Sequence, residues 1–409
     1  MAYFQVVMIA AVVGLLAAPA TAATALVSNT ADAGAGSFRA AVEAANSDPA
    51  ITSIRFRRDL GRIELQSTVT YAGAQALTID GLGTEIGSAA AQTFDLFIVE
   101  GGNDLTLRSL TFREGDNGIS IDIPPFGKGQ VSIVMFEVIV FDNLRFGLLI
   151  DEGDQTPEET FGASINLVIA ASQFARNGLL DTNDEDEGDV DAVRVNERGD
   201  GDITAVVIDS VFVNNGADGF ELDEEGPGDA TMTALNSAFD DNGLTREGGD
   251  DGLDIDESED GGIWMKVVGS SFNRSTDDGI GLDESGEGDL EISLVQVEAS
   301  ANLDSGISAD EADGGDFEVE LARVTADENE DKGADFSEGN AEIAGSGEGG
   351  FDGRIDASSF SDNADDGIAA EQLAPGIGVL RLVNVALDGN GGEAVDAEGV
   401  EVIVLRGLS

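Results

Sequence analysis

The sequence contains no cysteine and no histidine among its 409 residues. Without cysteine there is no disulfide bond and no thiol chemistry. Without histidine there is no histidine-based triad, no imidazole general base and no imidazole ligand for a metal. Any chemistry must therefore use carboxylates, hydroxyls, the 20 Lys and Arg residues or a bound metal ion.

Basic residues are scarce, and only three of them are lysines. The 81 acidic residues outnumber the 20 basic ones, and the net charge is −61. Nucleic acid and anionic membrane surfaces are therefore poor partners. A disordered acidic chain is also excluded, because 42% of the residues are apolar and recur in register. Adaptation to a salty environment stays open as an explanation of the charge.

Large aromatic residues with a polar atom are rare: Trp264 is the one tryptophan, and Tyr3 and Tyr71 are the two tyrosines. Flat platforms on which sugar rings could stack are therefore few. We expect Trp264 to lie in the core or at the end of a strand.

Long hydrophobic runs are limited to Val6–Ala18, which is too short to span a bilayer comfortably. The small residues Ala20, Thr21 and Ala22 follow it as a cleavage site, so residues 1–22 are predicted to be a secretory signal peptide. The n-region carries no Lys or Arg, and an N-terminal membrane anchor is the alternative. We expect the mature chain to be exported and to have no membrane span.

One repeat dominates the second half of the chain. The glycines Gly252, Gly279, Gly306 and Gly333 are 27 residues apart. Around them the motif recurs as ADGFELDEEGPGD from Ala217, DDGLDIDESEDGG from Asp250, DDGIGLDESGEGD from Asp277 and DSGISADEADGGD from Asp304. A fixed period of this length with short strand-like units predicts a β-solenoid.

About ten such coils are predicted, each with an apolar anchor followed by an acid-Gly step. The predicted anchors are Phe112, Phe136, Phe174, Phe212, Phe239, Phe272, Val297, Val324, Phe360 and Val385. The polar residues three positions later should stack as a ladder at a corner; they are Asn177, Asn215, Asn242, Ser275, Ser300, Asp327, Asn363 and Asp388. The predicted organisation is a signal peptide (1–22), a cap with the first coils (23–103) and regular acidic coils (104–409).

The segment after the signal peptide is predicted to begin with a short helix. Ser37 is a good N-cap, and Phe38–Ala45 has the spacing of an amphipathic helix. A solenoid exposes apolar core and an unpaired strand edge at its open end, so this helix is expected to act as a cap.

A family resemblance rests on this same segment. The order Asn29-Thr30-x-Asp32-x-Gly34-x-Gly36-Ser37-Phe38-Arg39-x-Ala41-Val42-x-x-Ala45-Asn46, followed by Leu77-Thr78-Ile79-Asp80-Gly81, resembles the N-terminal portion of exported bacterial right-handed parallel β-helix proteins of the pectate-lyase-like superfamily. The resemblance implies an all-β, right-handed parallel β-helix and a secreted, extracellular or periplasmic location in a bacterium. It is weak for function, because such proteins include enzymes and adhesins.

A column of acids is predicted four residues after each acid-Gly glycine. Its members are Asp122, Asp151, Asn196, Asp223, Asp256, Asp283, Asp310, Ser337, Glu371 and Asp396. In-register stacking would space them by about 4.8 Å, where two charges repel by about 3.5 kcal/mol at an effective dielectric constant of 20. The adjoining Glu224, Glu257, Glu284 and Glu311 are expected to add to this repulsion. The column is therefore either fully solvated or occupied by cations.

The turns that follow the column favour cations. Asp256-x-Ser258-x-Asp260-Gly261 and Asp283-x-Ser285-x-Glu287-Gly288 place oxygen atoms at alternate positions, like the first half of an EF-hand loop. Position twelve, normally Glu, is Val267 or Leu294 here, so a neighbouring coil would have to complete the shell. The predicted ligands of a structural Ca²⁺ are Asp223, Asp256, Ser258, Asp260, Asp283, Ser285, Glu287 and Asp310.

Two functional classes remain open. A uronate lyase could use Lys266 or Arg274 as its base beside Ca²⁺-binding acids, and a glycoside hydrolase could use the doublets Asp250-Asp251 or Asp277-Asp278. The acids recur in coil after coil, however, whereas an active site is a local break in a repeat. We therefore favour a non-catalytic surface or matrix module that binds divalent cations, with extracellular polysaccharide as a further partner.

Overall fold

The computed structural model describes residues 22–89, 93–125, 129–153, 162–179, 190–245, 249–312, 314–339, 349–373 and 375–406. The predicted signal peptide lies outside these residues except for Ala22. Among the described residues no helix is both long enough and apolar enough to cross a membrane.

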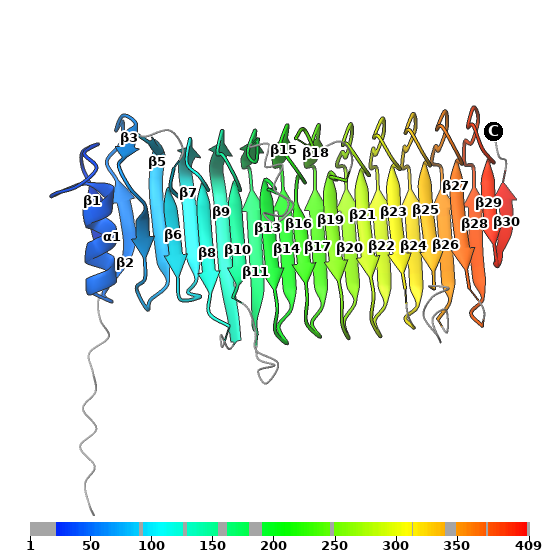
Figure 1. The fold of residues 1–409 in the computed structure, drawn as a ribbon, viewed down its shortest axis with the longest axis horizontal. Coiled ribbons are helices and arrows are strands. Elements are labelled where there is room, and N and C mark those ends of the chain that lie inside the picture. The colour runs from blue at the N-terminus through cyan, green and yellow to red at the C-terminus, as the bar shows by residue number, and fades with distance from the viewer. Residues whose placement is uncertain are drawn as a thin grey trace, which may run out of the picture.

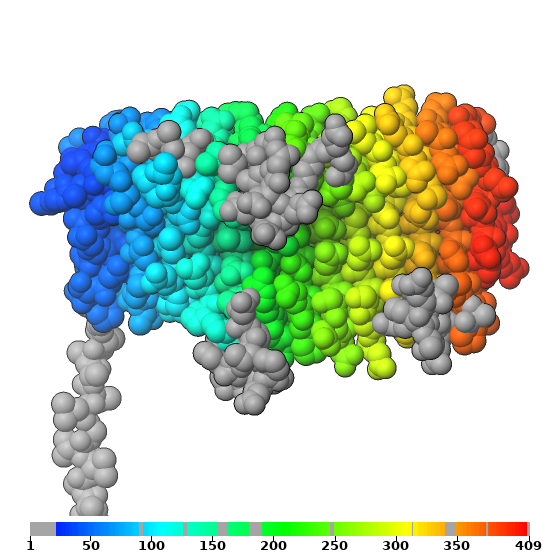
Figure 2. Space-filling view, in the orientation of Figure 1, coloured from blue at the N-terminus to red at the C-terminus, as the bar shows by residue number. Residues whose placement is uncertain are grey.

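The strands stack in parallel along one axis, with the N-terminal coils at one end of the molecule and the C-terminal coils at the other (Figure 1). Every strand pair is parallel and joins one coil to the next. The chain is an all-β, right-handed parallel β-helix, the hand that crossover connections between parallel strands almost always take. The fold predicted from the repeat is thus confirmed, and Figure 2 shows the coils closing into a continuous rod.

Two sheets run the length of this rod. Sheet A contains 18 strands: β1 (Ala23–Val27), β2 (Ile51–Phe56), β3 (Ile63–Leu65), β5 (Leu77–Ser88), β7 (Leu105–Arg113), β9 (Gly129–Phe141), β11 (Ala163–Ala170), β12 (Gln173–Ala175), β14 (Ile203–Ile208), β15 (Val211–Val213), β17 (Ala230–Leu235), β18 (Ala238–Asp240), β20 (Ile263–Val268), β22 (Leu290–Val295), β24 (Phe317–Ala322), β26 (Phe351–Asp356), β28 (Gly378–Val383) and β30 (Val400–Arg406). Sheet B contains 12 strands: β4 (Val69–Tyr71), β6 (Phe97–Glu100), β8 (Ile119–Ile123), β10 (Leu148–Glu152), β13 (Val193–Glu197), β16 (Glu221–Glu224), β19 (Leu253–Glu257), β21 (Ile280–Glu284), β23 (Ile307–Glu311), β25 (Ala334–Glu338), β27 (Ile368–Gln372) and β29 (Val395–Glu398).

The N-terminal end is covered by the one helix in the described residues, α1 (Phe38–Ser47). The hydroxyl of Ser37 accepts a hydrogen bond from the backbone N–H of Ala40 at 3.1 Å, as expected for an N-cap. Phe38 and Val42 on its apolar face are buried in the core. The predicted capping helix is confirmed, and it runs two residues further than expected.

The interior contains a stack of phenylalanine rings. Phe174, Phe212, Phe239 and Phe272 follow one another with ring centroids 5.2, 4.8 and 4.8 Å apart. The predicted anchors Phe136, Val297, Val324 and Val385 are wrong as members of this column. Strand pairing places Val140, Ala299, Ala326 and Leu387 there instead, and Phe136 is exposed on β9.

An exchange of side-chain volume between two inward-facing positions explains why these anchors were misassigned. Two residues before each phenylalanine of the stack stands a serine, such as Ser237 or Ser270. Where alanine replaces phenylalanine, at Ala299 and Ala326, the serine becomes Val297 or Val324. The large side chain therefore moves by two positions on the inward face and keeps the interior filled.

An asparagine ladder follows the stack at the next corner. Asn177, Asn215 and Asn242 are buried. Nδ2 of Asn177 donates to Oδ1 of Asn215 at 3.2 Å, and Nδ2 of Asn215 donates to Oδ1 of Asn242 at 2.9 Å. The ladder was predicted correctly at Asn177, Asn215, Asn242, Ser275 and Asn363. It was wrong at Ser300, Asp327 and Asp388, because the anchors were misplaced there; the ladder residues are Asn302, Asn329 and Asn390.

The glycines of the acid-Gly step are required by close contact between coils. An ideal Cβ on Gly219, Gly252, Gly279 or Gly306 of the acid-Gly step would lie 2.5–2.7 Å from the carbonyl oxygen of the next glycine in the column. None of these four has a positive φ. Most of the left-handed corners are instead occupied by non-glycine residues such as Asn236 (φ 49°) and Asp241 (φ 59°), although Gly269 (φ 68°) takes one of them.

Candidate functional site

The outer carboxylate column lies on the solvent-facing side of sheet B, one residue per coil. Strand pairing joins Asp122, Asp151, Asn196, Asp223, Asp256, Asp283, Asp310, Ser337 and Glu371 in this order. The predicted stacking is confirmed for these residues. Asp396 is wrong, because Glu398 pairs with Glu371 and Asp396 pairs with Ala369.

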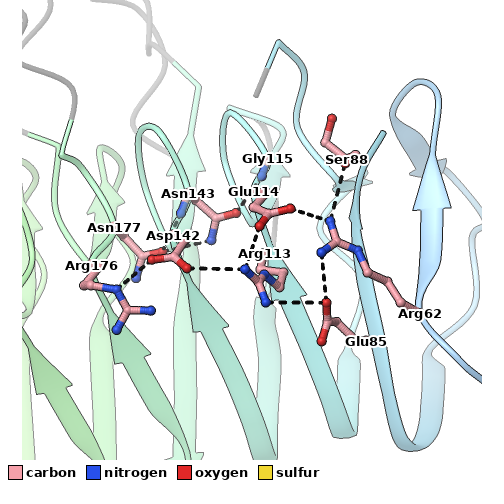
Figure 3. A network of polar contacts seen from close by, with 10 residues as sticks. All are labelled: Arg62, Glu85, Ser88, Arg113, Glu114, Gly115, Asp142, Asn143, Arg176 and Asn177. Atoms are coloured by element: carbon pink, nitrogen blue, oxygen red, sulfur yellow. Dashed lines mark hydrogen bonds and ion pairs between the residues drawn. The ribbon is translucent and has the colours of Figure 1, made fainter. Parts of the chain in front are cut away.

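In the N-terminal coils, acids of a different corner are paired with arginines (Figure 3). Arg113 contacts Glu114 at 2.6 Å and Asp142 at 3.6 Å, and Arg176 contacts Asp142 at 2.7 Å. Arg62 joins the same network through Glu85 at 3.1 Å. Here the chain supplies its own cations to stacked carboxylates.

The outer face of sheet B receives such a cation at β13. The guanidinium of Arg194 lies 3.5 Å from Asp191, 2.8 Å from Glu221 and 3.0 Å from Asp223. Its Nε also donates to Oδ1 of Asn196 at 3.0 Å. The side chain of Arg194 is mostly buried, and Asp191 and Glu221 are buried as well.

This cluster has more acids than its one arginine can neutralise. One carboxylate oxygen from each of Asp191, Asp218 and Glu221 lies within 4.8 Å of the other two. Burial works against the charge of Arg194, but Glu221, Asp191 and Asp223 hold its pKa above the usual value. Burial and the charge of Asp191 raise the pKa of Glu221 well above its ordinary value. The cluster therefore retains a proton or requires a second cation.

A second internal cation lies five strands further along sheet B, beside β25. The ammonium of Lys332 is 3.2 Å from Asp331 and 2.7 Å from Asp335. Between Arg198 and Lys332 the described basic residues are Lys266, Arg274 and Arg323, and none lies on the outer face of sheet B. We call the described acids on this stretch of sheet B the uncompensated acidic face; its members are Asp218, Asp251, Asp254, Asp256, Asp277, Asp278, Asp283, Asp304 and Asp310.

The uncompensated acidic face brings carboxylates together in two further groups. Oxygens of Asp254 and Asp256 lie within 4.8 Å of each other and of an oxygen of Glu221, the partner of Arg194, and the oxygens of Asp277, Asp278 and Asp304 form the second group. Burial, reinforced by neighbouring aspartates, raises the pKa of Asp256 to about 6. For Asp278 burial is again the main cause, and its pKa rises to about 8.

The predicted Ca²⁺ ligands are divided between this face and the turns. Asp256 lies in one of the groups, Asp223 is paired with Arg194, and Asp283 and Asp310 line a shallow depression of about 400 Å³ together with Ser285. The turn residues behave differently. The hydroxyls of Ser258 and Ser285 donate to the backbone carbonyls of Glu224 and Glu257 in the preceding coil, at 3.4 and 3.3 Å.

Asp260 and Glu287 are exposed on the turns and belong to none of the carboxylate groups formed by described residues. The structure thus gathers oxygen atoms across neighbouring coils rather than along an EF-hand loop. Occupancy by Ca²⁺ stays a prediction.

The predicted catalytic bases lie apart from the acids. Lys266 is exposed on the outer face of sheet A. Arg274 lies at a left-handed corner (φ 61°), where its Nε and Nη2 donate to Asp241 at 2.6 and 2.8 Å. A lyase site built from these bases and the sheet B acids is therefore not assembled in one place.

The predicted acid doublets stack along one edge of sheet B. Oδ1 of Asp251 accepts the backbone N–H of Asp278 at 2.7 Å, and Oδ1 of Asp278 accepts that of Ser305 at 2.6 Å. Asp277 belongs to the group that contains Asp278, and Asp250 is buried in the preceding coil. This one-sided arrangement suits a shared proton or cation better than two carboxyls opposed across a glycosidic bond.

Trp264 was expected in the core or at the end of a strand; it lies outside the core, at the second position of β20. It alternates with the buried Ile263 and Met265, so its half-buried indole faces outward from sheet A. With Lys266, Glu291 and Glu318 it lines a shallow depression of about 400 Å³.

A buried acidic column was missed by sequence reasoning. Glu152, Glu197, Glu224, Glu257, Glu284, Glu311 and Glu338 end successive sheet B strands, and their exposed fractions are 0–1%. We call them the inner glutamate column. Period-two alternation was the signal that could have found them, because each follows an outward-facing residue of the outer carboxylate column.

No protein-family model matches the chain, and no curated protein matches it in sequence. Among solved structures, pectate lyase Pel9A is similar with 14% identity and a TM-score of 0.42, over 93% of this chain and 80% of that one. The A-module of the Azotobacter vinelandii mannuronan C-5 epimerase AlgE6 shows 13% identity and a TM-score of 0.37, over 90% and 94%. The Streptococcus pneumoniae surface protein and adhesin PfbA shows 10% identity and a TM-score of 0.38, over 88% and 94%. Likeness at this level carries no information on activity.

Proposed function

We propose that the protein is an exported, non-catalytic β-helix whose uncompensated acidic face binds Ca²⁺, and that it serves as a structural or binding module at the cell surface or in the matrix. The observation that carries the proposal is the distribution of internal cations. Arg194 and Lys332 neutralise the two ends of the acidic face, and no described basic side chain neutralises the coils between them.

The donor chemistry supports Ca²⁺ over other metals. With no histidine and no cysteine, every side-chain ligand on this face is an oxygen atom, and hard oxygen ligands in a flexible arrangement suit Ca²⁺. A Ca²⁺ ion held by Asp254 and Asp256 of β19 would also reach Glu221 of β16, which pairs with Arg194 as well, and would thereby join two adjacent coils. Bound cations would thereby stiffen the rod.

Ca²⁺ should stabilise the folded protein more than monovalent salt does. At a free concentration one hundred times the dissociation constant, each site adds about 2.7 kcal/mol to the free energy of unfolding. We expect a clear rise in Tm in millimolar Ca²⁺ relative to EDTA, measured by circular dichroism. Proton release should accompany binding at neutral pH, because the pKa of Asp278 is raised to about 8 by burial.

Variants locate the site. Asp254→Asn together with Asp256→Asn should remove much of the Ca²⁺-dependent rise in Tm. Asp260→Asn tests the turn, and Asp388→Asn, an exposed residue on a distant coil, is the matched control; both should leave the rise unchanged. Equal stabilisation by molar NaCl without Ca²⁺ would show mere screening and would rule out specific sites.

A polysaccharide-active enzyme is the second candidate function, and the outward-facing Trp264 favours it. Its outward-facing, half-buried indole can stack on a sugar ring, while Glu291 and Glu318 beside it can accept hydrogen bonds from hydroxyl groups. Because Trp264 is the one tryptophan, its fluorescence reports on this depression alone. If the candidate is right, a polyuronate or a neutral glucan will shift the emission, and Lys266→Ala will reduce cleavage of that polymer. Unchanged emission with both polymers contradicts it.

A further inference from the structure

The inner glutamate column goes beyond the proposed Ca²⁺ face, since it lies on the opposite side of sheet B. Strand pairing stacks Glu197 on Glu224, and then Glu257, Glu284, Glu311 and Glu338 in successive coils. All are buried in the interior at the corner where a sheet B strand ends. Neighbouring side chains are one strand spacing apart, about 4.8 Å.

The column receives hydrogen bonds mainly from the turns that follow it. The carboxylate of Glu224 accepts the backbone N–H of Gly226 at 3.1 Å and of Gly228 at 3.3 Å. Glu197 accepts those of Gly199 at 2.9 Å and Gly201 at 3.2 Å. These bonds fix the side chains pointing inward, but they do not supply a positive charge.

No cationic side chain faces the described part of the column. The sheet A residues packed at the same corner are apolar; they are Ala163, Ile203, Ala230, Ile263, Leu290, Phe317 and Phe351. The charged groups that act on it from the turns are acids, Asp229 on Glu257 and Asp316 on Glu338. Arg198 directs its guanidinium to the carboxylate of Asp151 and the backbone carbonyl of Glu152.

Several carboxylate oxygens in the column lack a donor. Both side-chain oxygens of Glu284, and Oε2 of Glu257, are buried without a hydrogen-bond donor among the described groups. A buried carboxylate with neither donor nor counter-ion is strongly unfavourable. The group that stacking places beside each of these oxygens is the carboxyl of the neighbouring coil.

We infer that neighbouring glutamates of the inner column share protons, so that one carboxylic acid donates to the next carboxylate and the interior of the β-helix binds protons at neutral pH. Each shared proton stays on its own oxygen and forms an O–H···O⁻ hydrogen bond to the next coil; such bonds are short and strong in a dry interior.

A proton fits this column better than a metal ion does. Each gap between coils offers two carboxyl groups, which is sufficient for a proton but too few for Ca²⁺, which needs six to eight oxygen ligands. None of the groups of three acids found among the described residues includes a member of the column. At the C-terminal end of the column, Gln372 lies in register with Glu338, and its side chain is the neutral analogue of a protonated glutamate.

The pKa values agree with this arrangement. Burial is the main cause in both members that do not adjoin a predicted Ca²⁺ ligand, and it raises the pKa of Glu197 to about 8 and that of Glu338 to about 9. A raised pKa in the folded state means that the folded chain binds more protons than the unfolded one. The resulting stabilisation is complete below the unfolded pKa of about 4.5 and is lost as the pH rises through the folded values.

Because of the amino-acid composition, few other side chains titrate in this range of pH. No histidine or cysteine titrates between the ordinary carboxyl range and the lysine range. Above pH 7 the other carboxyls that lose protons are those on the outer face, such as Asp278. A variant on each side of sheet B separates the two contributions.

The decisive measurement is infrared spectroscopy of the wild-type mature protein in EDTA at about pH 7.5, below the pKa values of Glu197 and Glu338. We expect the carbonyl stretch of protonated carboxylic acids, which ordinary glutamates lose by this pH. Glu284→Gln should weaken that band, whereas Asp278→Asn should remove only the contribution of that one outer-face aspartate. No band in the wild-type protein, or a band unaltered by Glu284→Gln, overturns the inference.

Unfolding as a function of pH is the second readout. For each proton held by the folded state, the unfolding equilibrium constant should rise about tenfold per pH unit below the folded pKa. Glu284→Gln should reduce this slope between pH 7 and 10, whereas Glu287→Gln, an exposed residue on the following turn, should not. Equal slopes in both variants, or stoichiometric metal binding that Glu284→Gln abolishes, would contradict proton sharing. The Ca²⁺ proposal would be untouched, since these assays contain EDTA.

Discussion

Replacing Arg194 with alanine should lower the free energy of unfolding by about 3–5 kcal/mol, the cost of removing one partner from a buried ion pair. Among the described residues Arg194 is the one cation within reach of Asp191, Glu221 and Asp223, and the first two are buried. Without it these carboxylates must take up protons or repel one another at short range. The loss should be measured by chemical denaturation in EDTA at neutral pH.

Arg274→Ala is the matched control, because Arg274 also forms a bidentate pair but an exposed one, with Asp241. Exposed pairs contribute about 0.2–1 kcal/mol. Acidification should reduce the loss in Arg194→Ala, since protonation of Glu221 and its neighbours removes the repulsion. Equal losses in the two variants would show that the Arg194 cluster is not a buried electrostatic unit.

Gly315→Ala should destabilise the protein by more than about 4 kcal/mol, a range reached by few single substitutions. The glycine column of the turns contains Gly201, Gly228, Gly261, Gly288 and Gly315. A Cβ on Gly315 would overlap the backbone carbonyl oxygen of Gly288 in the preceding coil. Because the overlapping atom belongs to the backbone, relief requires the coils to separate, and a broken turn would also disturb the buried Glu311, whose Oε1 accepts the N–H of Gly315 at 3.1 Å.

Gly314→Ala provides the control at the adjacent position, where a Cβ would meet no atom within 4 Å and φ is not positive. We expect it to be neutral or slightly stabilising, because alanine restricts the unfolded chain more than glycine does. Thermal unfolding of the two variants side by side tests the contrast. Comparable Tm values would mean that the turns are free to move apart and that coil-to-coil contact does not explain the glycines.

The sequence by itself determined the β-helix, most of its register and the capping helix. The asparagine ladder forms at Asn177, Asn215 and Asn242 as predicted, and the outer carboxylate column is in register except at Asp396. The reason is that the 27-residue period and the alternation of side chains are properties of the chain itself. A parallel stack then repeats each local choice in every coil.

Only the tertiary structure decided which side chains share an environment. The inner glutamates look like solvated acids in sequence, and burial becomes evident only when the strand is followed to its last residue and the turn folds over it. Arg194 was overlooked because its partners Glu221 and Asp223 are one coil away, 27 and 29 residues along the chain. The exchange of a large and a small side chain between Val297 and Ala299 likewise keeps the interior filled, but it breaks the regular spacing from which the anchors were predicted. The balance of charge and of side-chain volume depends on contacts between neighbouring coils, whereas the periodicity is a property of the sequence of each coil.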